Sequence, residues 1–114
     1  MIRAKHRFHG RGSLDYVYRR GRLVRGGELS IKFVDSRAQD YRLAVVVSKK
    51  VSKSAVTRNR IRRRIYEYFR NYRKEQGKPI PFDLVITAHS DALAHIDASK
   101  LGTLIEELIK KTKI

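Results

Sequence analysis

The chain has 114 residues, of which 41% are hydrophobic, and its 27 lysines and arginines against 11 acidic residues give a formal net charge of +16. This length supports one domain with one core, and the absence of cysteine excludes disulfides, thiolate catalysis and thiolate zinc sites. No apolar run approaches the roughly 20 residues of a membrane span, so we expect a cytoplasmic protein that does not bind membranes.

The positive charge is concentrated in the first two thirds of the chain. Residues 1–74 hold 22 basic and 5 acidic residues, a net charge of +17, whereas residues 75–114 hold 5 and 6, a net charge of −1. Between Tyr41 and Tyr66 there are nine lysines and arginines and no acidic residue. Such a surface attracts a polyanion, most often RNA or DNA. The sequence therefore predicts a nucleic-acid-binding part and a near-neutral scaffolding part.

The first predicted segment in chain order is a mobile basic arm over residues 1–12. Ser13 is expected to cap a short helix over 14–20, in which apolar residues recur at helical spacing and which Gly21 ends. A short strand over 22–25 follows.

Two longer strands come next. Apolar and polar residues alternate over 28–35, which is typical of a half-buried strand, and the nearly unbroken apolar run within 41–48 predicts a more deeply buried one. We expect these two strands to pair in the antiparallel sense.

A long helix is predicted from Ser54–Thr57 to just before Gly77. Its apolar positions lie within about a 100° sector, as expected of a face that packs on a core; they are Ile61, Ile65, Tyr68, Phe69 and Tyr72. Arginines crowd the start of this helix, where the helix dipole favours acidic residues instead. The misplaced charge predicts a polyanionic partner at this end.

The rest of the chain predicts a strand over 82–87 and an amphipathic helix over 97–111. The buried face of that helix should comprise Leu101, Leu104, Ile105, Leu108 and Ile109. The element order αβββαβα describes an α+β fold, a single-domain α/β sandwich over residues 1–114, with helices on one face of one sheet and the other face partly free.

On the long helix, Arg58, Arg62 and Tyr66 recur at intervals of four and form one ridge, beside a second ridge that begins with Asn59 and Arg63. Arginine's planar fork binds two phosphate oxygens at once. Membrane-surface and calmodulin-type binding are disfavoured, because the apolar stripe of this helix ends in aromatic residues that suit a core. A helix-turn-helix reader is disfavoured because the helix follows a strand.

Several segments together resemble the signature of the bacterial ribonuclease P protein component. The most specific is Ser48-Lys49-Lys50-Val51 followed by Ala55-Val56-Thr57-Arg58-Asn59-Arg60-Ile61-Arg62-Arg63. Residues 14–21 and 82–86 are similar to the family's early and late motifs. Leu14 departs from the family's aromatic, and Tyr66 stands where many members have another basic residue.

The resemblance implies a fold similar to domain 2 of ribosomal protein S5, with a left-handed crossover through the central helix. It also implies a protein subunit of ribonuclease P, a ribonucleoprotein endonuclease that removes the 5′ leader of precursor tRNA. The partners would be the catalytic RNA and precursor tRNA, with no protein partner required. Mg²⁺ would be bound mainly by the RNA, which carries the hydrolysis.

The resemblance further implies two sets of binding residues and no catalytic or metal-binding residue in the protein. The catalytic RNA would contact Lys53, Arg58, Asn59, Arg60, Arg62 and Arg63. The single-stranded leader would lie between the first helix and the sheet, against Tyr18, Phe33, Lys49 and Lys50, with bases stacking on the aromatic rings.

Two other functions remain open at this point. The chain could be a ribosomal or chaperone-like RNA-binding protein without a role in cleavage, or a metal-dependent nuclease that acts alone. His89 and Asp91 could help bind a metal, but a pair without further ligands is more typical of a surface loop.

Overall fold

The computed structural model describes residues 11–35 and 40–112. The predicted basic arm therefore lies almost wholly outside the described residues. The elements are α1 (Arg11–Arg20), β1 (Arg22–Arg25), β2 (Leu29–Asp35), β3 (Arg42–Val46), α2 (Ala55–Gln76), β4 (Phe82–Ala88), the 3-10 helix η2 (Asp91–Ala94) and α3 (Ala98–Thr112). The predicted order αβββαβα is confirmed, and η2 is added where the sequence predicted only a loop.

The four strands form one mixed sheet in the order β1-β2-β4-β3. β1 pairs with β2 and β2 with β4 in the antiparallel sense, whereas β3 pairs with β4 in parallel. The predicted pairing of β2 with β3 is therefore wrong. The last strand in the sequence lies between them, and α2 connects the parallel neighbours β3 and β4. This is the crossover for which the resemblance predicts a left-handed turn.

β4 takes the central position because it is apolar on both faces. Its consecutive residues Leu84, Val85 and Ile86 are all buried, and an unbroken buried run is typical of a strand covered on both sides. The edge strand β3 alternates between buried and partly exposed residues, whereas β2, the other inner strand, begins with three consecutive buried residues.

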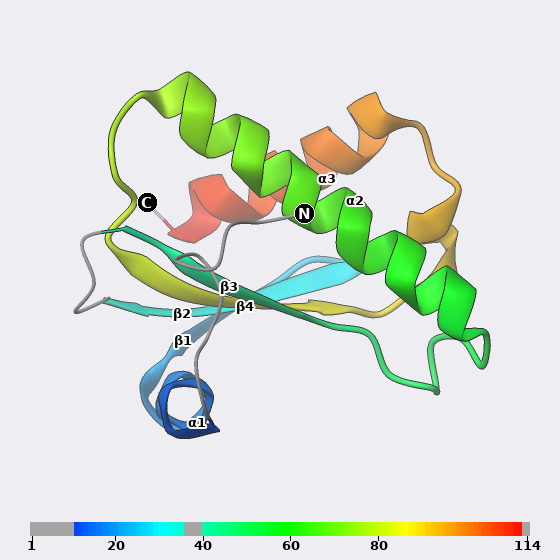
Figure 1. The fold of residues 1–114 in the computed structure, drawn as a ribbon, viewed down its shortest axis with the longest axis horizontal. Helices are drawn as coiled ribbons and strands as arrows, with labels where there is room; N and C mark the ends of the chain where they lie inside the picture. The colour runs from blue at the N-terminus through cyan, green and yellow to red at the C-terminus, as the bar shows by residue number, and fades with distance from the viewer. Residues whose placement is uncertain (1–10, 36–39, 113–114) are drawn as a thin grey trace.

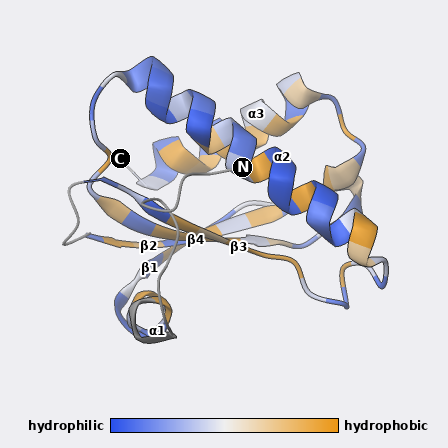
Figure 2. Ribbon diagram, in the orientation of Figure 1, coloured by the Kyte–Doolittle hydropathy of each residue, from blue (hydrophilic) through white to orange (hydrophobic). Residues whose placement is uncertain are grey.

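The helices cover both faces of the sheet (Figure 1). α2 and α3 lie on one face and enclose the main core, whereas α1 lies on the other face, so the prediction of all helices on one face is wrong for α1. Val17 of α1 is fully buried, as is Val85 of β4, and neither belongs to the main core. Figure 2 shows hydrophilic residues along the outer side of α2 and hydrophobic ones along the sheet.

The limits of α2 agree with the sequence prediction. The Ser54 side chain accepts a hydrogen bond from the Thr57 backbone N–H at 3.2 Å, which satisfies one free amide of the first turn. Gly77 ends the helix with a φ of 68°, a left-handed conformation that glycine adopts without strain. Ile61, Ile65 and Phe69 are buried as predicted.

The start of α1 differs from the prediction. The helix already includes Arg11, so Ser13 lies within its first turn and not before it. Its end at Gly21 is confirmed: the Gly21 N–H donates to the Val17 carbonyl at 2.8 Å, and a Cβ on Gly21 would collide with that same oxygen. Only glycine lets the chain leave α1 this close to β2.

Asp40 joins the segment before β3 to the end of α2 and to the segment before β4. Its carboxylate accepts hydrogen bonds from the Tyr41 N–H at 2.9 Å, the Ile80 N–H at 3.0 Å and Arg73 Nε of α2 at 2.8 Å. Burial alone would raise the pKa of this carboxyl, but the two backbone donors and Arg73 together hold the pKa below its ordinary value. The ionised form therefore stabilises the fold.

Replacing Asp40 with Asn should lower the free energy of unfolding at pH 7 by about 1–3 kcal/mol, because a charged acceptor of three hydrogen bonds is lost. The contribution of Asp40 is fully present above its unfolded pKa, about 3.9, and is lost as the pH falls through the lower folded value. Urea unfolding should therefore show the difference between the two proteins shrinking below about pH 4. Equal stabilities at pH 7 would contradict this role.

No helix among the described residues is long and apolar enough to cross a membrane.

Candidate nucleic-acid interface

Among the described residues, basic side chains are most concentrated in the turn between β3 and α2 and at the start of α2. The turn is closed by hydrogen bonds from the Val51 and Ser52 N–H groups to the Ser48 carbonyl, at 3.1 and 3.4 Å. The first turn of α2 carries no acidic residue. The exposed amides of a helix start and the lysines of the turn therefore present positive potential at the same end of α2.

Five basic side chains of this region are exposed, namely Lys49, Lys50, Lys53, Arg60 and Arg63. With the other described residues, none of the five makes a side-chain hydrogen bond or an ion pair. Within the described part of the chain, no acidic side chain pairs with their charges. Such a group can neutralise phosphates without first breaking an internal contact.

Arg58 and Arg62 serve the fold as well as the surface. Arg58 Nη1 donates to the Ser52 and Lys53 carbonyls at 2.9 and 3.0 Å, and so fastens the basic turn to α2. Arg62 donates to Asn59 Oδ1 at 2.8 Å and to the Val47 carbonyl at 3.4 Å. Both side chains therefore position the turn, and their contact with RNA stays a prediction.

Arg64 is the last of the arginines that crowd the start of α2, and its side chain points away from the β3–α2 turn. Its guanidinium donates to the Leu93 carbonyl of η2 at 2.6 Å and also to the Ile96 carbonyl. These bonds tie α2 to the segment that leads into α3. One member of the arginine run is thus a structural residue, which the sequence pattern alone could not reveal.

Replacing Arg64 with Ala should lower the free energy of unfolding by about 1–3 kcal/mol, because two partly buried carbonyls lose a charged donor. The salt dependence of RNA binding should not change. Thermal or urea unfolding measures the first effect, and titration of RNA at several salt concentrations measures the second. A normal stability combined with a smaller salt dependence would instead assign Arg64 to the RNA surface.

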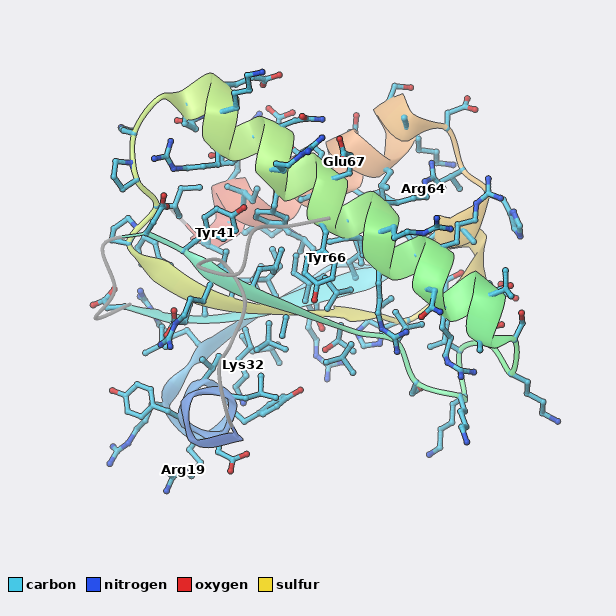
Figure 3. The ribbon with its side chains drawn as sticks, in the orientation of Figure 1. Arg19, Lys32, Tyr41, Arg64, Tyr66 and Glu67 are labelled. Atoms are coloured by element: carbon cyan, nitrogen blue, oxygen red, sulfur yellow. The ribbon has the colours of Figure 1, made fainter. Side chains whose placement is uncertain are left out.

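A second candidate surface lies on the α1 face of the sheet. Tyr18 of α1 is 41% exposed, and the Lys32 ammonium lies 5.9 Å from the centre of its ring. Lys32 also donates to the Tyr18 carbonyl at 2.5 Å, which holds the cation near the end of α1. In Figure 3, Lys32 lies between α1 and the sheet.

The strand register shows which side chains share this face with Lys32. Lys32 pairs with Val85 and Val85 with Ala44, so these three form one row across β2, β4 and β3. The row beside it contains Asp83 and Arg42, which form an ion pair with an N–O distance of 2.6 Å. Arg42 and Lys32 were not predicted as site residues, since their strands showed only a partly polar face.

Phe33 does not belong to this surface, and its predicted contact with the leader is wrong. Its side chain lies on the opposite face of the sheet from Lys32, is only 3% exposed and is part of the main core. The Arg22 guanidinium covers its ring at 4.8 Å from the centroid, and Phe82 packs against it edge-on. No base can stack on this ring.

The predicted residues therefore fall into two groups. Lys49 and Lys50, assigned to the leader, lie with Lys53 in the turn before α2. Tyr18 lies on α1, on the other side of the sheet from α2. The sheet thus separates the start of α2 from α1, so Lys49 and Lys50 lie with the residues predicted to contact the catalytic RNA and apart from Tyr18. The roles of both groups stay predictions.

The described residues contain no group of three or more His, Asp or Glu side chains that could hold a metal ion. His89 instead lies 3.0 Å from Ser30 Oγ, measured from its Nε2 atom, and both residues border the α1 face.

Comparison with known proteins gives a consistent result. The family model described as ribonuclease P matches residues 2–113. The ribonuclease P protein component of Pseudanabaena sp. is 31% identical over 115 residues, which cover 100% of this chain and 97% of that protein. That of Synechococcus sp. is 40% identical over 76 residues, covering 57% of this chain and 60% of that protein.

Solved structures share the fold. The RNase P protein of Staphylococcus aureus superposes with a TM-score of 0.80 at 22% identity and covers 96% of both chains. The RNase P protein of Thermotoga maritima superposes with a TM-score of 0.77 at 22% identity, covering 92% of this chain and 96% of that one.

Proposed function

The chain belongs to the ribonuclease P protein family, and we propose that its two surfaces have separate RNA partners. As a protein subunit of this endoribonuclease, it would bind the catalytic RNA through the β3–α2 turn and the start of α2. The α1 face of the sheet would hold the 5′ leader of precursor tRNA. The two RNAs would then lie on either side of the sheet edge formed by β3.

One observation carries the assignment of the catalytic RNA. Five exposed basic side chains without described protein partners are grouped at a helix start that bears no acidic residue. A folded RNA supplies many phosphates in a fixed arrangement, and arginine and lysine neutralise them with little sequence preference. Arg58 supports this surface by fastening the turn that carries Lys49, Lys50 and Lys53.

The α1 face carries an aromatic ring and a nearby cation, the two kinds of group that bind single-stranded RNA. The half-exposed ring of Tyr18 can stack on a base, and Lys32 beside it can neutralise a phosphate. In the row of Lys32, the partly exposed edge-strand residue Ala44 has only a small side chain, which lets a backbone approach closely. A duplex has its bases stacked internally, so this surface favours single-stranded RNA.

The protein would contribute position and charge, whereas the phosphodiester chemistry would belong to the RNA and its Mg²⁺ ions. The basic surface lowers the electrostatic repulsion between two RNAs brought together. It should therefore reduce the magnesium concentration that leader removal requires. We propose that the protein acts in the cytoplasm.

Binding specificity tests the proposal against a ribosomal or chaperone-like role. Filter binding should show tight binding of the matching catalytic RNA and weaker binding of ribosomal RNA fragments of equal length at the same salt concentration. Cleavage of precursor tRNA by RNA-free protein would instead support a nuclease acting alone. Equal affinity for all structured RNAs would favour the chaperone-like role.

A further inference from the structure

A groove runs along the flank of α2 within the basic surface. It is lined by Val56, Asn59, Arg62, Arg63 and Tyr66. Val56 is 75% exposed, more than any other exposed large hydrophobic residue of the described chain. An apolar side chain this open contributes little to the core, and here it lies among charged groups that would suffice for phosphate binding alone.

The amide of Asn59 has a defined orientation in this groove. Arg62 Nη1 donates to Asn59 at 2.8 Å, and because arginine has only donors, the atom facing it must be the amide oxygen. The amide nitrogen of Asn59 therefore points elsewhere, and both of its hydrogens are unused among the described residues. Asn59 thus presents donors to the groove.

Tyr66 supplies a flat wall and a further donor. Its hydroxyl accepts a hydrogen bond from the Val45 N–H on edge strand β3 at 3.4 Å, which leaves the hydroxyl hydrogen available. In Figure 3, Tyr66 lies between α2 and the sheet. The groove therefore combines apolar surface from Val56 and the Tyr66 ring with donors from Tyr66, Asn59 and Arg63.

We infer that this groove binds one unstacked nucleobase of the catalytic RNA through an edge that carries hydrogen-bond acceptors. A nucleobase has two apolar faces and a polar edge. Its faces would contact the apolar surfaces of the groove, and its edge would accept hydrogen bonds from the donors there. A phosphate would leave the walls unused, and an apolar protein segment would leave the donors unpaired. The O6 and N7 atoms of guanine, or the carbonyls of uracil, fit best. This inference rests on the proposed function and adds recognition of one nucleotide to it.

The first test is Val56→Ala. Affinity for the catalytic RNA should fall about 3- to 15-fold, since the substitution removes two methyl groups from contact with the base. The slope of log affinity against log salt should not change, because no charge is lost. The fold should be unaffected, since the side chain is exposed and alanine favours a helix. Leu23→Ala is the matched control: Leu23 is 50% exposed but lies on β1, and its loss should not alter binding.

A second test identifies the nucleotide. A photoreactive benzoylphenylalanine placed at position 56 should crosslink to one unpaired nucleotide of the RNA, whereas the same group at position 23 should not. With that nucleotide made abasic, Val56→Ala and Asn59→Ala should cause no further loss of affinity, because their partner is already gone.

Unchanged affinity of Val56→Ala, or crosslinks spread over many nucleotides, would overturn the base-binding groove while leaving the RNA-binding surface intact. Failure of the unmodified protein to bind the catalytic RNA at all would overturn the proposed function itself.

Discussion

A rise in salt from 50 to 200 mM is expected to weaken binding of the catalytic RNA roughly 100- to 500-fold. We assume that the five exposed basic residues of the β3–α2 turn and the start of α2 each neutralise one phosphate. Each such contact contributes about 0.7–0.9 to the slope of log affinity against log salt, which gives the stated change. Binding titrations across this salt range measure the slope directly, and a slope near zero would exclude a phosphate-dominated interface.

Arg60→Ala should reduce that slope by about one contact while leaving stability unchanged, because the Arg60 side chain has no partner among the described residues. Arg64→Ala is the matched control: it removes the same charge four positions along the helix, but its guanidinium is bound to the carbonyls of Leu93 and Ile96. Equal slopes for Arg60→Ala and the unmodified protein would place Arg60 outside the interface.

Tyr18→Ala should weaken binding of precursor tRNA with a long leader by about 1–3 kcal/mol, because a stacked base loses its platform. Binding of the catalytic RNA and of leaderless tRNA should be nearly unchanged. The measurement is the affinity of the assembled RNA–protein enzyme for substrates with leaders of different length. Arg60→Ala should do the reverse and impair assembly whatever the leader length.

Two variants act as controls for Tyr18. Tyr18→Phe keeps the ring and should retain affinity, whereas Tyr16→Ala removes an equally exposed ring, also 41%, from another side of α1 and should have no effect. Equal losses of affinity for long-leader and leaderless substrates would show that Tyr18 only supports the fold. The binding site for the leader would then lie elsewhere on the sheet.

The helices and strands could be predicted because their signals are local. The Ser54 cap, the stop at Gly77 and the apolar spacing of α2 depend on neighbours within a few residues. The strand order could not be predicted in this way, because β4 enters the sheet between β2 and β3 from a distant part of the chain. The apolar run of β4 was a local indication of its inner position, but the edge strand β3 carries a similar run, so this signal could not order the strands.

The candidate site was predictable in outline and not in detail. Charge patterning located the basic surface, but Arg58, Arg60 and Arg64 look alike in the sequence and differ in the structure. Their differences depend on which loop carbonyls the fold brings within reach. Phe33 is a different case, because its alternation with Leu29 and Ile31 already favoured burial, and the structure places it in the core.

The most direct measurement is leader removal from precursor tRNA by the matching catalytic RNA at low magnesium, with and without this protein. The proposed function predicts that added protein restores accurate cleavage at magnesium concentrations where the RNA alone is inactive, and that it preferentially increases the affinity for substrates with a leader. Cleavage that is unaffected by the protein at every magnesium concentration would contradict its role as a subunit that positions RNA.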